Sequence, residues 1–335
     1  MSVPPATLPP PSRESLRERA VHLQYRTAWA LAAALPERIA RRTPSVLGRA
    51  WHARASARQR DQVRRNLARV VGPGIRDDRL DALVEASYAS YARYWLDSFR
   101  LHRMDGAAVV AASRGEGLES LDAVRDAGSG GILATAHLGS WDVGAFWTGQ
   151  RHWRLVVVAE VVEPRRLFER FVRLREGIGI EVIPLVRGGD MLVRLEERVR
   201  DGSIATLLAD RDLTRKGPIV DFLGEPCRLP PGTAALARRT GALVHVGAFL
   251  TEGDGYLGRI SEVVDIAGLD VHDGTQVVAD SLGRLIREVP EQWHVFVPHW
   301  LADREPDHPV VAAWRAGEDW RSLARAGTDA GGAAP

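Results

Sequence analysis

His137 and Asp142 are the pair of residues whose types and spacing most directly suggest catalysis. The apolar run 131–136 predicts a buried strand that ends at His137, and the apolar stretch 141–147, after a Gly-Ser turn, predicts a helix. On one straight helix this spacing turns two side chains apart, but across a strand-to-helix turn they can face each other. We therefore expect the Asp142 carboxylate to hold one ring nitrogen of His137, which fixes the tautomer and leaves the second nitrogen free to take a proton.

Both residues also have ordinary structural explanations. A histidine at the end of a strand is more often a structural hydrogen-bonding residue than a catalyst. An aspartate early in a helix is often only a favourable charge at the positive end of the helix dipole. The residues themselves do not decide between these interpretations, so the decision depends on the segments that follow.

The apolar run 203–209 ends in three alternating charges, Asp210, Arg211 and Asp212. In open α/β sheets the loops after the carboxyl ends of the strands form the ligand crevice. A charge cluster directly after a buried strand is therefore expected to lie at the same edge of the sheet as His137.

Glu160 and Arg175 are two further candidates. Glu160 lies at the end of the predicted strand 155–161, which places it at that edge as well. Arg175 lies near the end of the predicted helix 165–177. There it is either an ordinary cation at the negative end of the helix dipole or a guanidinium aimed at a phosphate.

From residue 106 onward, apolar runs alternate with amphipathic helical patterns, which predicts an α/β core with a central, mostly parallel sheet flanked by helices. The preceding region is predicted to be helical. Its basic amphipathic stretch 13–42 either rests in a lipid interface or packs on the core with a solvated basic face. We predict four segments: a disordered tail (1–12), an N-terminal helical, membrane-facing region (13–105), the α/β core (106–305) and a loose C-terminal tail (306–335).

The composition narrows the possible classes of protein. The 335 residues carry 45 basic and 43 acidic side chains, and no nucleic-acid-binding module is recognisable, so nucleic acid is not an expected partner. Cys227 is the only cysteine, which excludes disulfides within the chain and metal sites built on cysteine. The apolar run 28–35 is too short to span a bilayer, and the proline-rich first residues do not have the pattern of a signal peptide.

Taken together, these segments resemble the bacterial lysophospholipid acyltransferase superfamily, in the branch of the lipid A biosynthesis acyltransferases. Within this branch they are most similar to the phosphatidylinositol mannoside acyltransferases. The resemblance covers about 13–303, and its motifs are 137–142 (the superfamily's His-x4-Asp, or HxxxxD), 208–212, 222–233 and 290–293. The His-x4-Asp motif alone is weakly specific, whereas the ordered set is strongly specific for the branch.

The resemblance implies a peripheral enzyme at the cytoplasmic face of the plasma membrane. It would transfer a fatty acyl group, palmitoyl in our expectation, from acyl-CoA or an acyl carrier protein to a mannose 6-hydroxyl of phosphatidylinositol mono- or dimannoside. No metal or cofactor is expected, because acyl-CoA is a substrate. The Pro-rich segment 219–233 and the Trp-rich stretch 141–153 are expected to receive the acyl chain, although a helix start and core packing explain them nearly as well.

In the implied mechanism, His137 is the general base and Asp142 orients it. Arg175 and Arg211 are the candidates for substrate phosphates or the oxyanion, and Glu160 and Asp210 for sugar hydroxyls. Backbone amides near Gly139 are further oxyanion donors. The alternatives are a related acyltransferase acting on another glycolipid or a lysophospholipid, a lipid-binding protein without turnover, and a nucleic-acid binder that uses the basic helices.

Overall fold

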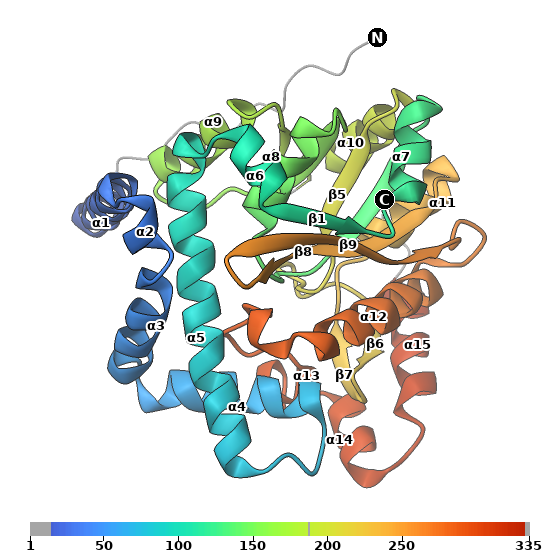
Figure 1. Cartoon of the computed structure of the whole chain (residues 1–335). Helices are drawn as coiled ribbons and strands as arrows, with labels where there is room; N and C mark the ends of the chain where they lie inside the picture. Colours follow the sequence, from blue (N-terminus) through green and yellow to red (C-terminus); the bar gives the residue numbers. More distant parts are fainter. Residues whose placement is uncertain (1–14, 187, 332–335) are drawn as a thin grey trace.

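The computed structural model describes residues 15–186 and 188–331, with only the backbone for 328–331. The expected disordered tail 1–12 lies outside the described residues. The fold consists of an α/β core with a helical layer along one side and a small C-terminal helical layer (Figure 1).

The N-terminal region forms a layer of helices, as predicted, and this layer stands beside the sheet in Figure 1. Its helices are α1 (Leu16–Ala34), α2 (Glu37–Ala40), α3 (Thr43–Arg54), α4 (Ala57–Val71) and α5 (Asp77–Arg100). A capping box between Ser15 and Glu18 starts α1. The residue before Pro36 is extended, because a proline disfavours helical backbone at the position before it. Helix α1 therefore ends before this proline.

The predicted central sheet is also confirmed. It has seven strands in the order β1-β9-β8-β2-β5-β3-β4, and each neighbouring pair is parallel except β8 and β9. The strands are β1 (Ser113–Glu116), β2 (Gly131–Thr135), β3 (Leu155–Glu160), β4 (Glu181–Leu185), β5 (Ile204–Leu208), β8 (Val244–Glu252) and β9 (Gly255–Val264).

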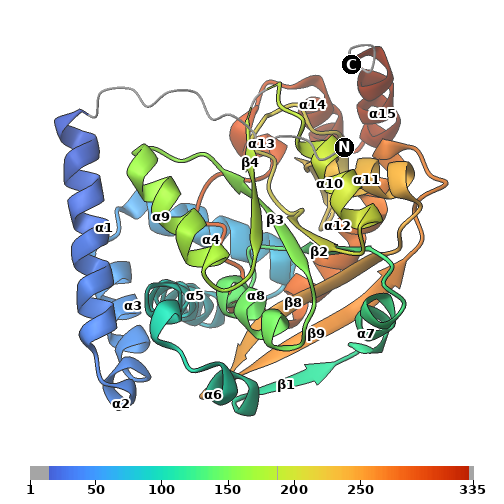
Figure 2. The ribbon, with the colours of Figure 1, turned by 90° about the horizontal axis from the view of Figure 1, so that it is seen from above.

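Helices cover both faces of this sheet, as the view from above shows (Figure 2). Successive residues of β2 point to opposite faces: Ile132 and Ala134 belong to one hydrophobic core, and Leu133 packs against the other. The first core includes α10 (Met191–Arg200), α11 (Gly232–Thr240) and α12 (Val271–Glu288). The second includes α6 (Gly106–Ala111), α7 (Glu119–Asp126), α8 (Trp141–Gln150) and α9 (Arg165–Glu176).

The expectation of a loose C-terminal end is wrong for most of that segment. After α13 (Leu301–Arg304), the chain forms α14 (Pro309–Ala316) and α15 (Trp320–Gly331). Buried apolar side chains of both helices pack against the short hairpin of β6 (Ile219–Phe222) and β7 (Glu225–Arg228). The polar and small residues of this segment predicted a loose end. The packing depends instead on Val310, Val311 and Trp320, which are at most 4% exposed.

Candidate active site

His137 and Asp210 form the centre of the site. His137 follows β2 and Asp210 follows β5, and these neighbouring parallel strands are in register with Thr135 opposite Leu208. The carboxyl ends of the two strands therefore bring the side chains together. The ring Nδ1 of His137 lies 2.8 Å from Asp210 Oδ1, and the backbone N–H of His137 donates to Asp210 Oδ2 at 3.0 Å.

This contact fixes the tautomer of the histidine. The neutral ring carries a proton on only one nitrogen, and an ionised carboxylate can only accept, so Nδ1 is the donor and Nε2 keeps its lone pair. The side chain of His137 remains 24% exposed, whereas that of Asp210 is fully buried. Burial alone would raise the pKa of Asp210, but the charge and hydrogen bonds of His137, with a hydrogen bond from Trp293, lower it to about 2. Asp210 is therefore an anion, and it binds one of the two ring nitrogens of the partly exposed His137.

The expected contact between Asp142 and His137 is wrong. Asp142 lies in the first turn of α8, as predicted, but its carboxylate points to the helical layer. Its Oδ1 accepts from Arg175 Nε at 3.0 Å, and its Oδ2 accepts from Tyr94 Oη at 3.0 Å and from Ser98 Oγ at 3.1 Å. Asp142 is 3% exposed. It joins α8, α5 and α9 in one buried polar network.

This network also changes the expected role of Arg175. Its guanidinium forms an ion pair with Asp142, and its side chain is 19% exposed. Burial works against the charge of Arg175, but the neighbouring carboxylate of Asp142 outweighs it and raises the pKa. Arg175 is thus already neutralised from inside the protein. Similarly, both oxygens of Asp210 are occupied by protein donors, so the sugar-binding role expected for Asp210 does not fit its geometry.

Arg211 and Glu160 remain at the accessible edge of the sheet. Glu160 is exposed at the end of β3. Arg211 is partly exposed, and no carboxylate of the described residues lies within ion-pairing distance of it. Its charge nevertheless influences Tyr91 of α5 and His299, which places it near the His137–Asp210 pair. Both side chains are therefore accessible at this edge of the sheet.

The turn between β2 and α8 depends on Gly139, as its position predicted. Gly139 has a φ of +66°, and a Cβ here would lie 2.2 Å from the carbonyl oxygen of Phe249. The expected oxyanion donors at this turn are occupied: the N–H of Gly139 donates to the Gln292 carbonyl at 2.9 Å and that of Ser140 to the Phe249 carbonyl at 2.8 Å. The structure describes no hydrogen-bond partner for the first-turn amides of α8 at 141–143.

One aromatic ring contacts His137 and joins it to a larger aromatic cluster on α5. Trp141 meets the ring of His137 edge to face at 5.5 Å and stacks on Tyr94 at 3.8 Å. His294 stacks on Tyr91 at 4.7 Å. Of the Trp-rich stretch that was expected to receive an acyl chain, only Trp141 lies here, because Trp147 and Trp153 are buried in the core of the sheet.

Two other buried histidines lie close to the pair. Burial lowers the pKa of His294 to about 3 and the pKa of His299 to about 4, so both rings stay neutral at physiological pH. Within the part of the chain that the structure describes, no cluster of three His, Cys, Asp or Glu residues has the geometry to hold a metal ion.

The partnership of His137 with Asp210 and the contribution of Trp293 were not predicted from the sequence. The residues nevertheless carried a signal for both. The charge cluster after 203–209 and the motif 290–293 had each been noted, but nothing in their spacing shows that one indole reaches that carboxylate.

Comparisons with known proteins agree with the family suggested by the sequence. The family model described as bacterial lipid A biosynthesis acyltransferase matches residues 11–302. A phosphatidylinositol mannoside acyltransferase of Mycolicibacterium smegmatis is 41% identical over 288 residues, which is 84% of this chain and 91% of that protein. A protein of the same name from Mycobacterium tuberculosis is 39% identical over 302 residues, or 88% of this chain and 93% of that one. Since both the model and these relatives cover most of its length, the chain belongs to the bacterial lipid A biosynthesis acyltransferase family.

Proposed function

We propose that this protein transfers a fatty acyl group from acyl-CoA to a mannose 6-hydroxyl of phosphatidylinositol mono- or dimannoside, with palmitoyl as the acyl group. The observation that carries the reaction class is the His137–Asp210 pair at an accessible sheet edge, in a chain of an acyltransferase family. The names of the relatives support the acceptor, because they are phosphatidylinositol mannoside acyltransferases.

In this mechanism, Nε2 of His137 takes the proton of the acceptor hydroxyl as its oxygen attacks the thioester carbonyl. Asp210 holds the opposite nitrogen and stabilises the positive ring that forms. When the tetrahedral intermediate collapses, the carbon–sulfur bond breaks, and the ring returns its proton to the leaving thiolate. General-base assistance of this kind contributes about 10²- to 10⁴-fold in rate.

Arg211 is the best-placed cation for a substrate phosphate or the oxyanion, because no carboxylate of the described residues neutralises it. Glu160 is exposed at the same edge, where it can accept hydrogen bonds from sugar hydroxyls. We assign Arg175 and Asp142 a structural role, since they fix the start of α8 and thereby the turn that carries His137.

We further propose that the protein binds the cytoplasmic face of the plasma membrane through the surface of α1–α3. None of the described helices has the length and apolarity of a membrane span. Segment 16–54 contains eight arginines and only two glutamates. Leu16, Leu23 and Leu31 are 82%, 51% and 65% exposed on α1. Apolar side chains on a basic helix suit an anionic lipid interface.

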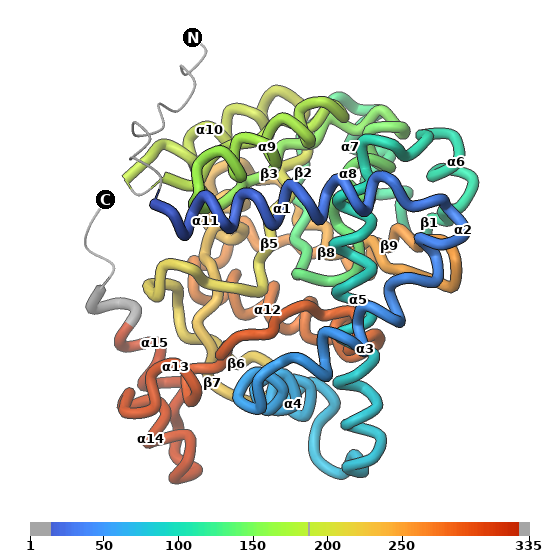
Figure 3. The backbone as a smooth tube through the Cα atoms, turned by 90° about the vertical axis from the view of Figure 1, so that its left-hand side faces the viewer, coloured from blue at the N-terminus to red at the C-terminus, as the bar shows by residue number. Residues whose placement is uncertain are grey.

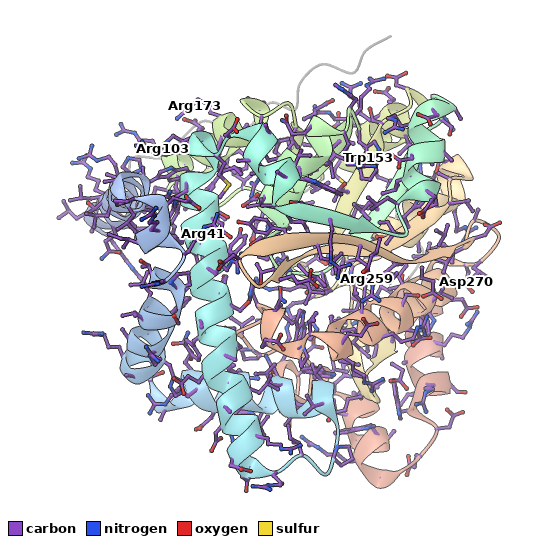
Figure 4. The ribbon with its side chains drawn as sticks, viewed as in Figure 1. Arg41, Arg103, Trp153, Arg173, Arg259 and Asp270 are labelled. Atoms are coloured by element: carbon purple, nitrogen blue, oxygen red, sulfur yellow. The ribbon has the colours of Figure 1, made fainter. Side chains whose placement is uncertain are left out.

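Figures 3 and 4 show where these helices lie. In Figure 3, α1 runs across the front of the molecule, between α9 above it and α3 and α5 below it. In Figure 4, Arg41 and Arg103 lie on the same side as α1 and α2. Membrane binding is tested by sedimentation with anionic vesicles: Leu23→Glu and Leu31→Glu should weaken it, whereas Leu243→Glu, at a residue 46% exposed outside the helical layer, should not. Equal binding of all three variants would refute this surface.

The reaction is tested with palmitoyl-CoA and purified phosphatidylinositol mannosides, comparing the wild type with His137→Ala. Transfer by the wild type alone supports the proposed base and acceptor. Transfer to another glycolipid or a lysophospholipid, with none to mannosides, would keep the reaction class and replace the acceptor. A folded His137→Ala protein with undiminished activity would refute the mechanism.

A further inference from the structure

Trp293 donates a hydrogen bond to the second carboxylate oxygen of Asp210, and this indole has no role in the mechanism proposed above. Its indole Nε1–H donates to Asp210 Oδ2 at 2.8 Å. The same oxygen accepts the backbone N–H of His137 at 3.0 Å. Trp293 is 1% exposed and Asp210 is fully buried, so water does not compete for these bonds. Three protein donors thus share the two oxygens of one carboxylate.

The backbone around Trp293 is fixed to the catalytic turn as well. The N–H of His294 donates to the His137 carbonyl at 2.7 Å, and the Gln292 carbonyl accepts the N–H of Gly139. The side chain of Gln292 is in turn bonded to the backbone of Thr251 at the end of β8. Residues 292–294 therefore form a short antiparallel clamp on the residues that follow β2, and the indole has a defined position relative to His137.

We propose that Trp293 is a positioning residue that disperses the charge of Asp210 and so limits how strongly this carboxylate holds the protonated His137 ring. The proposal rests on the proposed role of His137 as the base. Each donor to an ionised carboxylate stabilises the ionised form and lowers its attraction for a proton. A carboxylate with three donors therefore makes the neighbouring imidazole a weaker base than one with two donors would.

Several other charged or titratable groups face the pair. They are His294 and His299 after η2 (Pro290–Gln292), Arg211 and Asp212 after β5, Cys227 of β7, and Tyr91, Tyr94 and Asp97 of α5. Burial raises the pKa of Asp97 to about 6, so this carboxyl titrates in the range of the test, in the wild type and in both variants alike. The two histidines stay neutral between pH 5 and 8 because burial lowers the pKa of each well below that range. Burial also raises the pKa of the Cys227 thiol. None of these three groups changes charge in the range where the test is made.

The test compares Trp293→Phe with Trp300→Phe. Trp300 is a matched control, because it is also fully buried but its Nε1–H donates to the Phe222 carbonyl at 2.9 Å. In kcat/KM measured against pH, activity falls at low pH as the base becomes protonated. We expect Trp293→Phe to move the midpoint of this fall upward by about half to one pH unit. We expect Trp300→Phe to leave the midpoint in place.

A second readout needs no turnover. In NMR spectra of the wild type, the indole N–H signal of Trp293, identified by its displacement in Asp210→Asn, should shift with the protonation of His137, and that of Trp300 should not. A midpoint that stays or moves down in Trp293→Phe, or an indole signal that is insensitive to pH, would overturn this role. Absence of acyl transfer in the wild type would instead refute the proposed function, because the indole signal is read without any substrate.

Discussion

Replacing Asp210 with asparagine should reverse the tautomer of His137. Oδ2 accepts two N–H donors, from the His137 backbone and from Trp293, so an amide at this position must place its carbonyl oxygen there. Its NH2 group then faces Nδ1 of His137, which has to accept. The ring proton moves to Nε2, and the lone pair that would receive the acceptor proton is lost.

The expected loss in kcat is about 10⁴-fold, the size that the same reversal produces in a Ser-His-Asp triad. This corresponds to about 5.4 kcal/mol of transition-state stabilisation. The fold should survive because the amide replaces the carboxylate at equal volume and keeps all three contacts as hydrogen bonds. Initial rates of CoA release, with circular dichroism and thermal unfolding as the folding control, measure both effects.

Asp142→Asn is the informative comparison, because it changes the other aspartate of the site in the same way. It breaks the buried ion pair with Arg175, and removing one partner of such a pair costs about 3–5 kcal/mol of stability. The folded fraction of this variant should keep far more activity than Asp210→Asn. The reasoning fails if Asp210→Asn keeps more than a tenth of wild-type activity, or if Asp142→Asn is equally slow at wild-type stability.

Three further predictions concern stability and binding. Burial lowers the pKa of His294 to about 3 and of His299 to about 4, and it raises the pKa of Asp97 to about 6. Between pH 6 and 4, unfolding therefore takes up two protons on the histidines and releases one from the aspartate, so the free energy of unfolding should fall by about 1.4 kcal/mol for each pH unit of acidification in the wild type and by about 2.7 kcal/mol in Asp97→Asn. Urea unfolding of both proteins at pH 6 and pH 4 measures this dependence, and the same dependence on pH in both would contradict it. Arg211→Gln should raise the KM for a phosphate-bearing substrate by about 10- to 100-fold, since a hydrogen bond to a charged group is worth about 1.5–3 kcal/mol. Its melting temperature should not change, because the substitution breaks no ion pair among the described residues; unchanged KM values for both substrates would remove Arg211 from the site. Gly139→Ala should destabilise the protein more than Gly241→Ala, because both positions have positive φ, which costs about 1–2 kcal/mol, but only at Gly139 does the new Cβ meet another backbone atom; equal losses in chemical unfolding would contradict the packing argument.

The sequence was a good guide to the scaffold of the site. The apolar run before His137 predicted a strand because parallel strands buried on both faces are apolar throughout. Gly139 predicted the tight turn, and the charges after 203–209 predicted a second contribution at the same edge. Each of these signals is local, since a few adjacent residues determine it.

The partners within the site were not predictable in the same way. Asp142 is close to His137 in sequence and Asp210 is 73 residues away, but the hydrogen bond goes to Asp210. This choice depends on the strand order, which places β5 directly beside β2, and on the register of that pair. It also depends on Arg175, whose side chain draws Asp142 toward α9. Pairing between distant strands leaves no local pattern in the residues themselves.

The position of His137 and Asp210 directly after β2 and β5 determines how the site responds to partial unfolding. Both strands lie in the interior of the sheet, and their backbone ladder is buried on both faces, so hydrogen exchange there should require opening of the whole core. By contrast, α1 packs only through one face, and fraying of this helix leaves the ladder intact. Heating or mild denaturant should therefore separate two events. The protein should first detach from lipid at the proposed membrane surface while it still reacts with soluble substrates. It should lose its activity only when the entire core unfolds.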